Sequence, residues 1–487
     1  MSYQGNKPAT SFESPKKDRF TGISGTTCSL TYPVSSVADI LVWVNGVKQD
    51  FTNYSVSGST LTLGGTLVSA DIVEVTYVGR TYGSIAPSDA SIVTSSLQDD
   101  AVTTAKINDG AVTSGKIASG VVPSLRPNAN PLIINGDMQV AQRGTSTSGI
   151  TGSNNFVVDR FRFDEGADAT LTMSQETLTS GNAFDNGFKK SLKLLVTTAD
   201  GSLASNQSEQ LMQSIEAQNL QLLKFGTSNA VNLTLAFWYK SNVTGTHVVT
   251  LDKEDSTRTT CPVEFTVSSA NTWEHKVLNF NADATIKAST GAITNDNGTG
   301  LRVMWNLAYG SDYTSGTNGD WTQGGVGHFS TSNQQNIGGS NNNYVEVTGV
   351  QLEVGQFTSS TLPPFQHEDF GNNLARCQRY YYLHAEGNGK SLGSGGYYNT
   401  QQAEFTLFTP VLMRTNPTLE IATGTDYYVI YRDNGSDTVN SFALNTESKK
   451  EAIRMNNNAQ ATVDSAGVAG HFVTNNNSAK LALTAEL

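Results

Sequence analysis

The sequence of 487 residues has few cysteines and no long apolar run. Its three cysteines, Cys28, Cys261 and Cys377, lie far apart and form neither a CxxC pair nor a Cys/His metal spacing. This pattern argues against a disulfide scaffold and a zinc site, and no cofactor is expected. No apolar run approaches about 18 residues, so insertion into a membrane is not expected.

Charge is also scarce, because Asp, Glu, Lys and Arg make up only 15% of the chain and leave a net charge of −12. The basic residues form no cluster beyond Lys16-Lys17 and Lys449-Lys450, which argues against a nucleic-acid partner. The first residues, from Met1 to Asn6, contain no apolar signal core. We therefore expect the protein to be made in a cytoplasm and released by lysis.

Gly, Asn, Ser and Thr are plentiful, and they separate many short runs of strand length. This arrangement predicts a mainly β protein, whereas long amphipathic helices are hard to find. The length exceeds one ordinary domain of roughly 100–200 residues. Composition and motifs divide the chain into four segments: 1–83, 84–127, 128–364 and 365–487.

The first segment predicts a small antiparallel β-sandwich. Asn45-Gly46 is a strong hairpin turn, a second hairpin is expected around Gly58-Ser59, and Trp43 is expected in the core. The expected strands are 40–44, 47–51, 54–57, 60–63 and 71–78.

Residues 97–117 contain a repeat with an offset of ten, because Ala101-Val102-Thr103 and Lys106-Ile107 return as Ala111-Val112-Thr113 and Lys116-Ile117. Each unit has only two firmly apolar residues, too few to order one chain alone. Lateral packing of identical chains would solve this, with Val102, Ile107, Val112 and Ile117 on the axis of a trimeric shaft. A disordered Thr/Ser/Gly linker is the alternative.

The third segment predicts a two-sheet jelly-roll sandwich. Only residues 208–223 have helical spacing, through Leu211, Ile215 and Leu222. The expected strands are 191–197, 231–239, 246–251, 263–267, 274–280, 301–306 and 344–352.

Two groups in this segment have a functional and a structural interpretation. Tyr313 and Trp321, in the long loop 308–343, could stack on sugar rings or fasten the loop to the sandwich. Asp137 and Asp159 with nearby arginines invite a glycosidase interpretation, but turn and ion-pair roles are more common for such residues, so no catalytic residue is assigned.

The last segment predicts a short helix at 372–382, with Cys377 and the following tyrosines packed inward and Arg376 and Arg379 bound to carbonyls or carboxylates. A tyrosine-rich β domain follows. Its outermost loops would contact a receptor. The candidate receptor-binding residues are Tyr397, Tyr398, Tyr427, Tyr428 and Tyr431, together with Tyr313 and Trp321.

Four stretches carry a resemblance to podovirus-like bacteriophage tail fibres. They are the run from Phe20 to Gly58 that includes VWVNGVKQ, the pair INGDMQVAQRG and VDRF, the junction FQHEDFGNNLARCQRYY, and FTPVLMRTNPT. The resemblance implies an N-terminal domain that docks to tail tube or adaptor proteins, a carbohydrate-binding-like jelly roll and a distal head.

The resemblance therefore implies a homotrimeric fibre of the virion tail that adheres to a host-surface glycan and is not an enzyme. A tailspike depolymerase is the first alternative, although no β-helix repeat near twenty residues is found. A structural virion appendage without its own receptor is the second.

Overall fold

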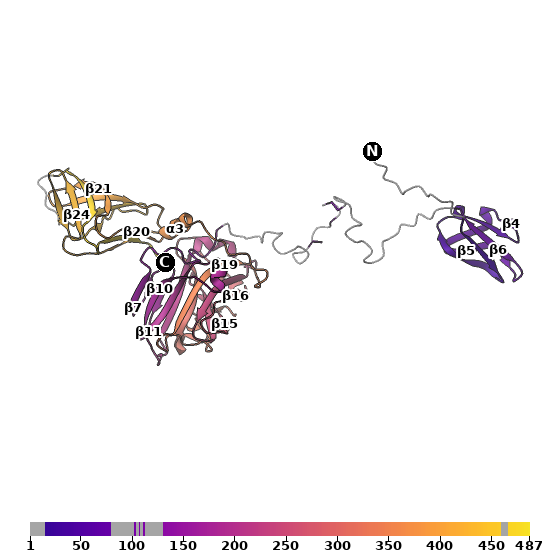
Figure 1. Ribbon diagram of the computed structural model, residues 1–487, viewed down its shortest axis with the longest axis horizontal. Helices are drawn as coiled ribbons and strands as arrows, with labels where there is room; N and C mark the ends of the chain where they lie inside the picture. Colours follow the sequence, from indigo (N-terminus) through magenta and orange to yellow (C-terminus); the bar gives the residue numbers. More distant parts are fainter. Residues whose placement is uncertain (1–14, 79–101, 104–106, 108–110, 113–129, 459–465) are drawn as a thin grey trace. The chain divides into compact units, whose positions relative to one another are not determined.

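The computed structural model describes residues 15–78, 102–103, 107, 111–112, 130–458 and 466–487. The chain divides into two compact units, Met1–Val122 and Pro123–Leu487. The described sheets are antiparallel and the helices are short, so the protein is mainly β, as predicted (Figure 1). No helix in these ranges is long and apolar enough to span a membrane.

The N-terminal domain is a small sandwich of two sheets (Figure 1). Its elements are β1 (Lys17–Thr21), β2 (Gly25–Val34), β3 (Ile40–Val44), β4 (Val47–Lys48), β5 (Tyr54–Leu67), β6 (Ile72–Tyr77) and 3-10 helices at Val37–Asp39 and Phe51–Asn53. The sheet β1-β6-β3-β4 and the pair β2-β5 share a core that includes Val42, Leu61 and Val75. The strands predicted at 40–44 and 71–78 are confirmed.

Two predictions for this domain are wrong. Residues 54–63 form no hairpin, because β5 continues past Gly58 (φ 60°) as one strand and pairs with β2 between Gly58 and Leu67. Trp43 is only partly buried, because it follows the buried Val42 in β3 and its side chain points to the opposite face of the sheet.

The repeat falls mostly outside the described residues. Val102, Ile107 and Val112 are exposed in the single chain, and Ile117 lies outside the described ranges. The choice between a trimeric shaft and a linker therefore stays a prediction.

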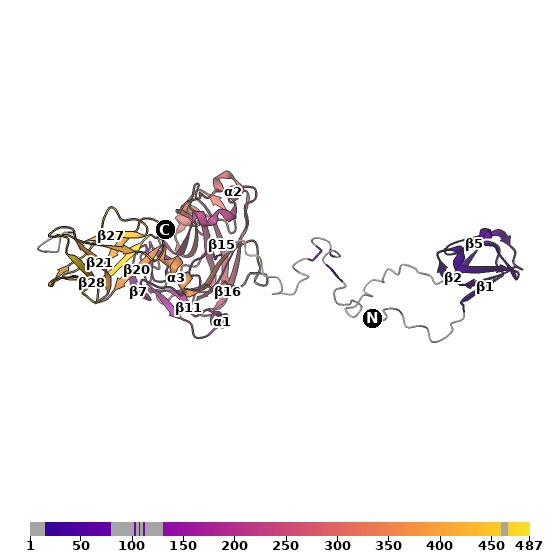
Figure 2. The same ribbon diagram turned by 90° about the horizontal axis from the view of Figure 1, so that it is seen from above.

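The next domain is a two-sheet sandwich, as predicted (Figures 1 and 2). Its strands are β7 (Ser146–Ile150), β8 (Asn155–Phe156), β9 (Arg162–Glu165), β10 (Thr170–Thr177), β11 (Lys190–Thr198), β12 (Ser208–Glu216), β13 (Leu233–Ser241), β14 (Gly245–Lys253), β15 (Thr259–Val267), β16 (Glu274–Phe280), β17 (Thr299–Tyr309), β18 (Thr322–Gln323) and β19 (Tyr344–Val354). Its helical pieces are α1 (Asn182–Asp185), α2 (Ala284–Lys287) and 3-10 turns at Ala217–Leu223, Ser289–Gly291, Ser311–Tyr313 and Val326–His328.

The two sandwich sheets have the strand orders β16-β13-β19-β11-β10-β7 and β18-β15-β14-β17-β12-β9-β8. Apolar side chains such as Phe237 and Trp305 fill the space between them. Each of the seven predicted runs falls on a strand, but the predicted helix at 208–223 is wrong. Those residues form the inner strand β12 and then a 3-10 helix, Ala217–Leu223.

The C-terminal domain, which we call the head, is a second sandwich (Figure 1). Its strands are β20 (Tyr381–Glu386), β21 (Ser391–Tyr397), β22 (Ala403–Phe408), β23 (Thr418–Ile421), β24 (Tyr428–Arg432), β25 (Gly435–Val439), β26 (Ala443–Leu444), β27 (Ala452–Asn456), β28 (Ala469–Thr474) and β29 (Lys480–Thr484). The sheets β20-β29-β23 and β25-β24-β28-β21-β22-β27-β26 enclose a core that includes Phe405, Tyr428 and Phe472.

Helix α3 (Phe370–Gln378) lies between the sandwich and the head (Figures 1 and 2). The helix begins where the Asp369 side chain accepts hydrogen bonds from two backbone N–H groups. Cys377 and Tyr380 pack with Ile134 and Val140, so the predicted helix and the inward position of these side chains are confirmed. The helix ends at Gln378, four residues before the predicted end, because Tyr381 and Tyr382 begin β20.

Candidate functional site

The exposed face of the seven-stranded head sheet is the candidate site. Phe405 and Phe472 point into the head core, so their neighbours Thr406 and His471 point outward. The register places Thr406 opposite Arg454 and His471 opposite Tyr431. We define the outer head face by these and neighbouring outward residues: Ser394, Tyr398, Glu404, Thr406, Phe408, Tyr431, Arg454 and His471.

A groove of about 420 Å³ runs along this face over β21 and β22. Its volume falls in the range of about 300–1,000 Å³ typical of small-molecule sites. Gly395 lets β21 and β22 approach each other closely, because a Cβ there would lie 1.9 Å from the Glu404 carbonyl oxygen. The lining residues are Ser394, Gly395, Gly396, Tyr397, Tyr398, Glu404, Phe405, Thr406, Phe408 and Arg454.

Aromatic side chains stand open to solvent on this face. Tyr398 is 67% exposed and Phe408 is 72% exposed, and both line the groove. Tyr431, 51% exposed, lies on β24, three strands from β22 and so about 14 Å away across the sheet. Open aromatic rings can stack on the apolar C–H faces of sugar rings.

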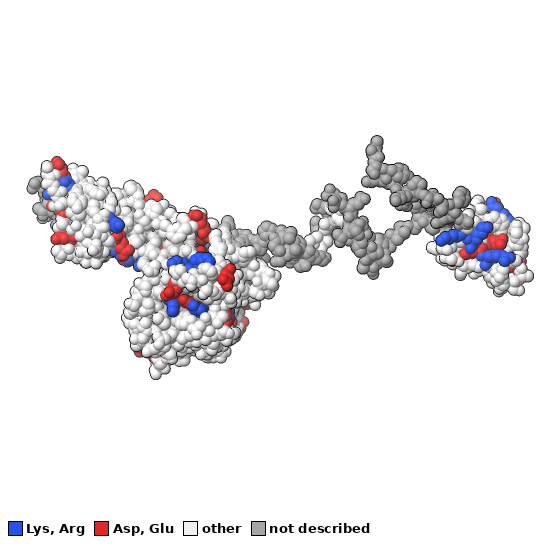
Figure 3. Space-filling view, viewed as in Figure 1, with Lys and Arg blue, Asp and Glu red and all other residues white. Residues whose placement is uncertain are grey.

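An ion pair supplies the polar part of the groove. The Arg454 guanidinium donates to one oxygen of Glu404 (Nε to Oε2, 2.8 Å), and Gln402 donates to the other oxygen (2.8 Å). Arg454 also pairs with Glu447, so these groups are held in place and can serve as fixed donors and acceptors for hydroxyl groups. In Figure 3, the visible surface of the sandwich and head carries few charged side chains.

The structure sorts the predicted receptor-binding residues by exposure. Tyr398 and Tyr431 lie on the outer head face, whereas Tyr313 and Tyr427 are partly buried. The Tyr313 hydroxyl donates to the Asn206 carbonyl (3.1 Å).

Tyr397, Tyr428 and Trp321 are buried in the domain interiors, which removes them from direct contact with a receptor. Their polar atoms are used inside the protein. Tyr428 donates to the carbonyl of Ala422 (2.7 Å), and the Trp321 indole donates to that of Asn281 (2.9 Å). Trp321 therefore fastens the loop 308–343 to the sandwich, which is the second of its two interpretations from the sequence.

Phe408 was missed by the sequence prediction. The signal was available in the alternation of Ala403–Phe408, where Phe405 and Leu407 are buried and Thr406 and Phe408 are exposed. An aromatic residue at an outward position of an alternating strand was therefore the sequence signal for this site.

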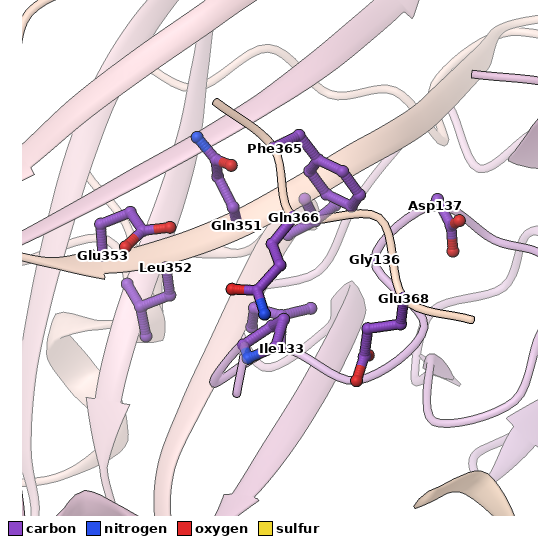
Figure 4. Close-up of a pocket in the computed structure, with 11 residues that line it drawn as sticks. Ile133, Gly136, Asp137, Gln351, Leu352, Glu353, Phe365, Gln366 and Glu368 are labelled. Carbon is purple, nitrogen blue, oxygen red and sulfur yellow. The ribbon is translucent and has the colours of Figure 1, made fainter. Parts of the chain in front are cut away.

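The junction between the sandwich and the head brings the INGDM and LARCQRYY motifs together, but its cavity is too small for a ligand. Figure 4 shows Asp137, Phe365 and Glu368 around it, and its volume of about 10 Å³ has room for at most one water molecule. Asn373 donates to Asn135 (3.4 Å), and Arg376 donates to Glu368 and to the Pro131 carbonyl (2.6 Å). These contacts fasten α3 to the sandwich.

The arginines and Asp159 that invited a catalytic interpretation have partners in the same junction. Arg143 and Arg160 both pair with Glu486, and the Arg160 guanidinium lies 3.4 Å above the Tyr380 ring centre. Asp159 accepts hydrogen bonds from Gln142, although burial still raises its pKa.

Arg379 is also an ion-pair residue, as predicted. It donates to both oxygens of Glu216 (2.7 and 2.9 Å), and Tyr380 donates to one of them (2.6 Å). Burial alone would raise the pKa of Glu216, but these bonds outweigh it and lower that pKa. The described ranges contain no group of three or more His, Cys, Asp and Glu side chains arranged to hold a metal ion.

No protein-family model matches the sequence, and no curated protein matches it. A structure of a candidate sugar-binding protein from Bacteroides thetaiotaomicron is 14% identical, covers 46% of this chain and 100% of its own, and has a TM-score of 0.26. The enzymatically active domain of bacteriophage CBA120 tailspike protein 4 is 13% identical, with 44% and 22% covered and a TM-score of 0.22. A family 11 carbohydrate-binding module from Clostridium thermocellum is 10% identical, with 44% and 98% covered and a TM-score of 0.21.

Proposed function

We propose that this protein is a phage tail fibre that binds a bacterial surface glycan through the outer head face. The observation that carries the proposal is the groove in which exposed Tyr398 and Phe408 accompany the fixed Glu404–Arg454 pair. Aromatic rings can stack on the apolar faces of a saccharide, and the fixed charged groups can form hydrogen bonds with its hydroxyl groups. The net charge of −12 favours stacking and hydrogen bonding over long-range attraction to anionic surfaces.

In this proposal the N-terminal domain attaches the fibre to tail tube or adaptor proteins of the virion. The protein adheres without cleaving the glycan. Three copies on one fibre strengthen weak single contacts, because the second and third contacts form at a high effective concentration.

Binding of the full chain to an array of bacterial surface polysaccharides tests the head. Tyr398→Ala and Phe408→Ala should each weaken binding about two- to twelvefold, because each loses stacking of about 0.5–1.5 kcal/mol. Phe370→Ala is the matched control, since Phe370 is exposed on α3 outside the groove. No binding to any polysaccharide, or equal binding by all three variants, contradicts the proposal. Release of reducing sugar would favour the depolymerase.

Light scattering tests the proposed trimer. The full chain should have a mass of about 156 kDa, three times 52.0 kDa. Deletion of residues 84–127 should lower the number of chains in each particle below three. Exposed Val102, Ile107 and Val112 are the apolar residues that would pack between chains. A monomeric full chain excludes the trimer and makes the segment a linker.

A further inference from the structure

The two exposed aromatic side chains of the groove lie at its opposite ends. The Tyr398 N–H donates to the Gln402 carbonyl (2.8 Å), so these residues are side by side where β22 begins. Phe408 is the last residue of β22. The chain advances six residues from Gln402 to Phe408, which is about 20 Å at about 3.3 Å per residue. The two rings therefore stand at positions about 20 Å apart along the strand.

The surface between the rings is a narrow channel parallel to the strands. On β21 the residues that face outward are small, namely Ser394 and Gly396. On the neighbouring β22, Glu404, Thr406 and Phe408 face outward. A volume of about 420 Å³ that extends over about 20 Å is too narrow for a compact ligand and suits an extended chain.

The groups that can bind hydroxyl groups lie between the two rings. Glu404 accepts hydrogen bonds from Arg454, and the exposed Thr406 lies opposite Arg454 in the register. Arg454 also pairs with Glu447, so one guanidinium serves two carboxylates. This excess of negative charge disfavours an anionic ligand at the centre of the groove and favours an uncharged one.

We propose that the groove binds an extended, uncharged stretch within a glycan chain, with one sugar ring on Tyr398 and another, several units along, on Phe408. This inference rests on the proposed function and specifies its ligand. A single terminal sugar reaches only one of the rings, because they are about 20 Å apart. Tyr398 is 67% exposed and Phe408 is 72% exposed, so the glycan chain can continue beyond both rings.

The dependence of affinity on glycan length tests this inference in the full chain. The probes are size-fractionated fragments of the polysaccharide that the array identifies, from the monosaccharide to chains longer than about 20 Å. Titration calorimetry should show that the short fragments bind about two- to twelvefold more weakly than the long ones, because a short fragment stacks on one ring only. Equal affinities for the monosaccharide and the longest fragment would overturn the inference.

Substitution of the two rings provides the second test. Tyr398→Ala and Phe408→Ala should each weaken a long fragment, and their effects should multiply in the double variant, because the two positions are far apart. A monosaccharide should be weakened by at most one of them. Tyr431→Ala is the matched control, since Tyr431 is exposed on the same face but lies on β24, outside the groove lining, and should bind every fragment like the parent.

Two outcomes separate this inference from the proposed function. If a long fragment depends on one ring only, the ligand is a terminal sugar, so the inference fails while the proposed function stands. If the full chain binds no polysaccharide of the array, both fail together.

Discussion

The sandwich and the head each have a seven-stranded sheet, but only the head leaves the outer face of that sheet open. In the sandwich, the chain after β17 folds back over the outward residues Met212 and Met304. Phe329 is buried against them, and its carbonyl accepts a hydrogen bond from Asn306 (2.8 Å). In the head, the equivalent outward positions of β22 carry the exposed Thr406 and Phe408.

Under the proposed function, this difference would give two sheets of similar size different uses. A sheet face covered by its own chain gains stability from apolar burial, but it cannot receive a partner. A bare face gives up that stability and keeps aromatic surface for binding. The same residue type should therefore have opposite roles in the two domains.

Phe329→Ala should produce the larger effect on stability. The change removes a buried ring and leaves a cavity, so we expect a loss of about 3 kcal/mol or more in the free energy of unfolding, measured by chemical denaturation. The matched change Phe408→Ala, on the bare face, should alter that free energy by less than about 0.5 kcal/mol. A large loss of unfolding free energy for Phe408→Ala would show that this ring is packed in the folded protein. It would contradict the interpretation of the outer head face as a bare face.

The covered domain should also respond to acid through His247. This residue is buried in the sandwich, where its ring nitrogens contact the Tyr239 hydroxyl (3.1 Å) and the Val243 carbonyl (3.0 Å). Burial lowers its pKa from 6.5 to about 4. As the pH falls below 6.5, the unfolded chain takes up the proton first, so native stability is lost progressively down to pH 4.

The shift corresponds to about 3 kcal/mol over that window. Unfolding should be measured at several pH values in the parent and in His247→Gln, and the variant should lose less stability between pH 6.5 and 4. His471→Gln, at an exposed position of the outer head face, is the control and should follow the parent. Equal profiles for the parent and His247→Gln would contradict the prediction.

Much of the fold could be predicted because the strands alternate or are strongly apolar. The failure at 208–223 has a physical cause. β12 lies between β17 and β9, and nearly all of its residues are buried, so it lacks the period of two that marks a half-exposed strand. The spacing of Leu211 and Ile215 then imitates a helix.

The candidate site could be predicted only in part. The tyrosine-rich pairs were visible in the sequence, but neighbours such as Tyr397 and Tyr398 point to opposite sides of a strand, and only the register shows which side is the core.

The interlocked junction has a consequence for how such heads can be exchanged between proteins. The LARCQRYY helix packs on the INGDM segment, and Arg143 and Arg160 hold Glu486 near the far end of the sequence. A chimera joined at residue 365 would take α3 and Glu486 from one protein and the INGDM segment, Arg143 and Arg160 from another. A transplantable cassette must therefore carry residues 131–160 together with the head, so the unit of recombination is a pair of distant segments.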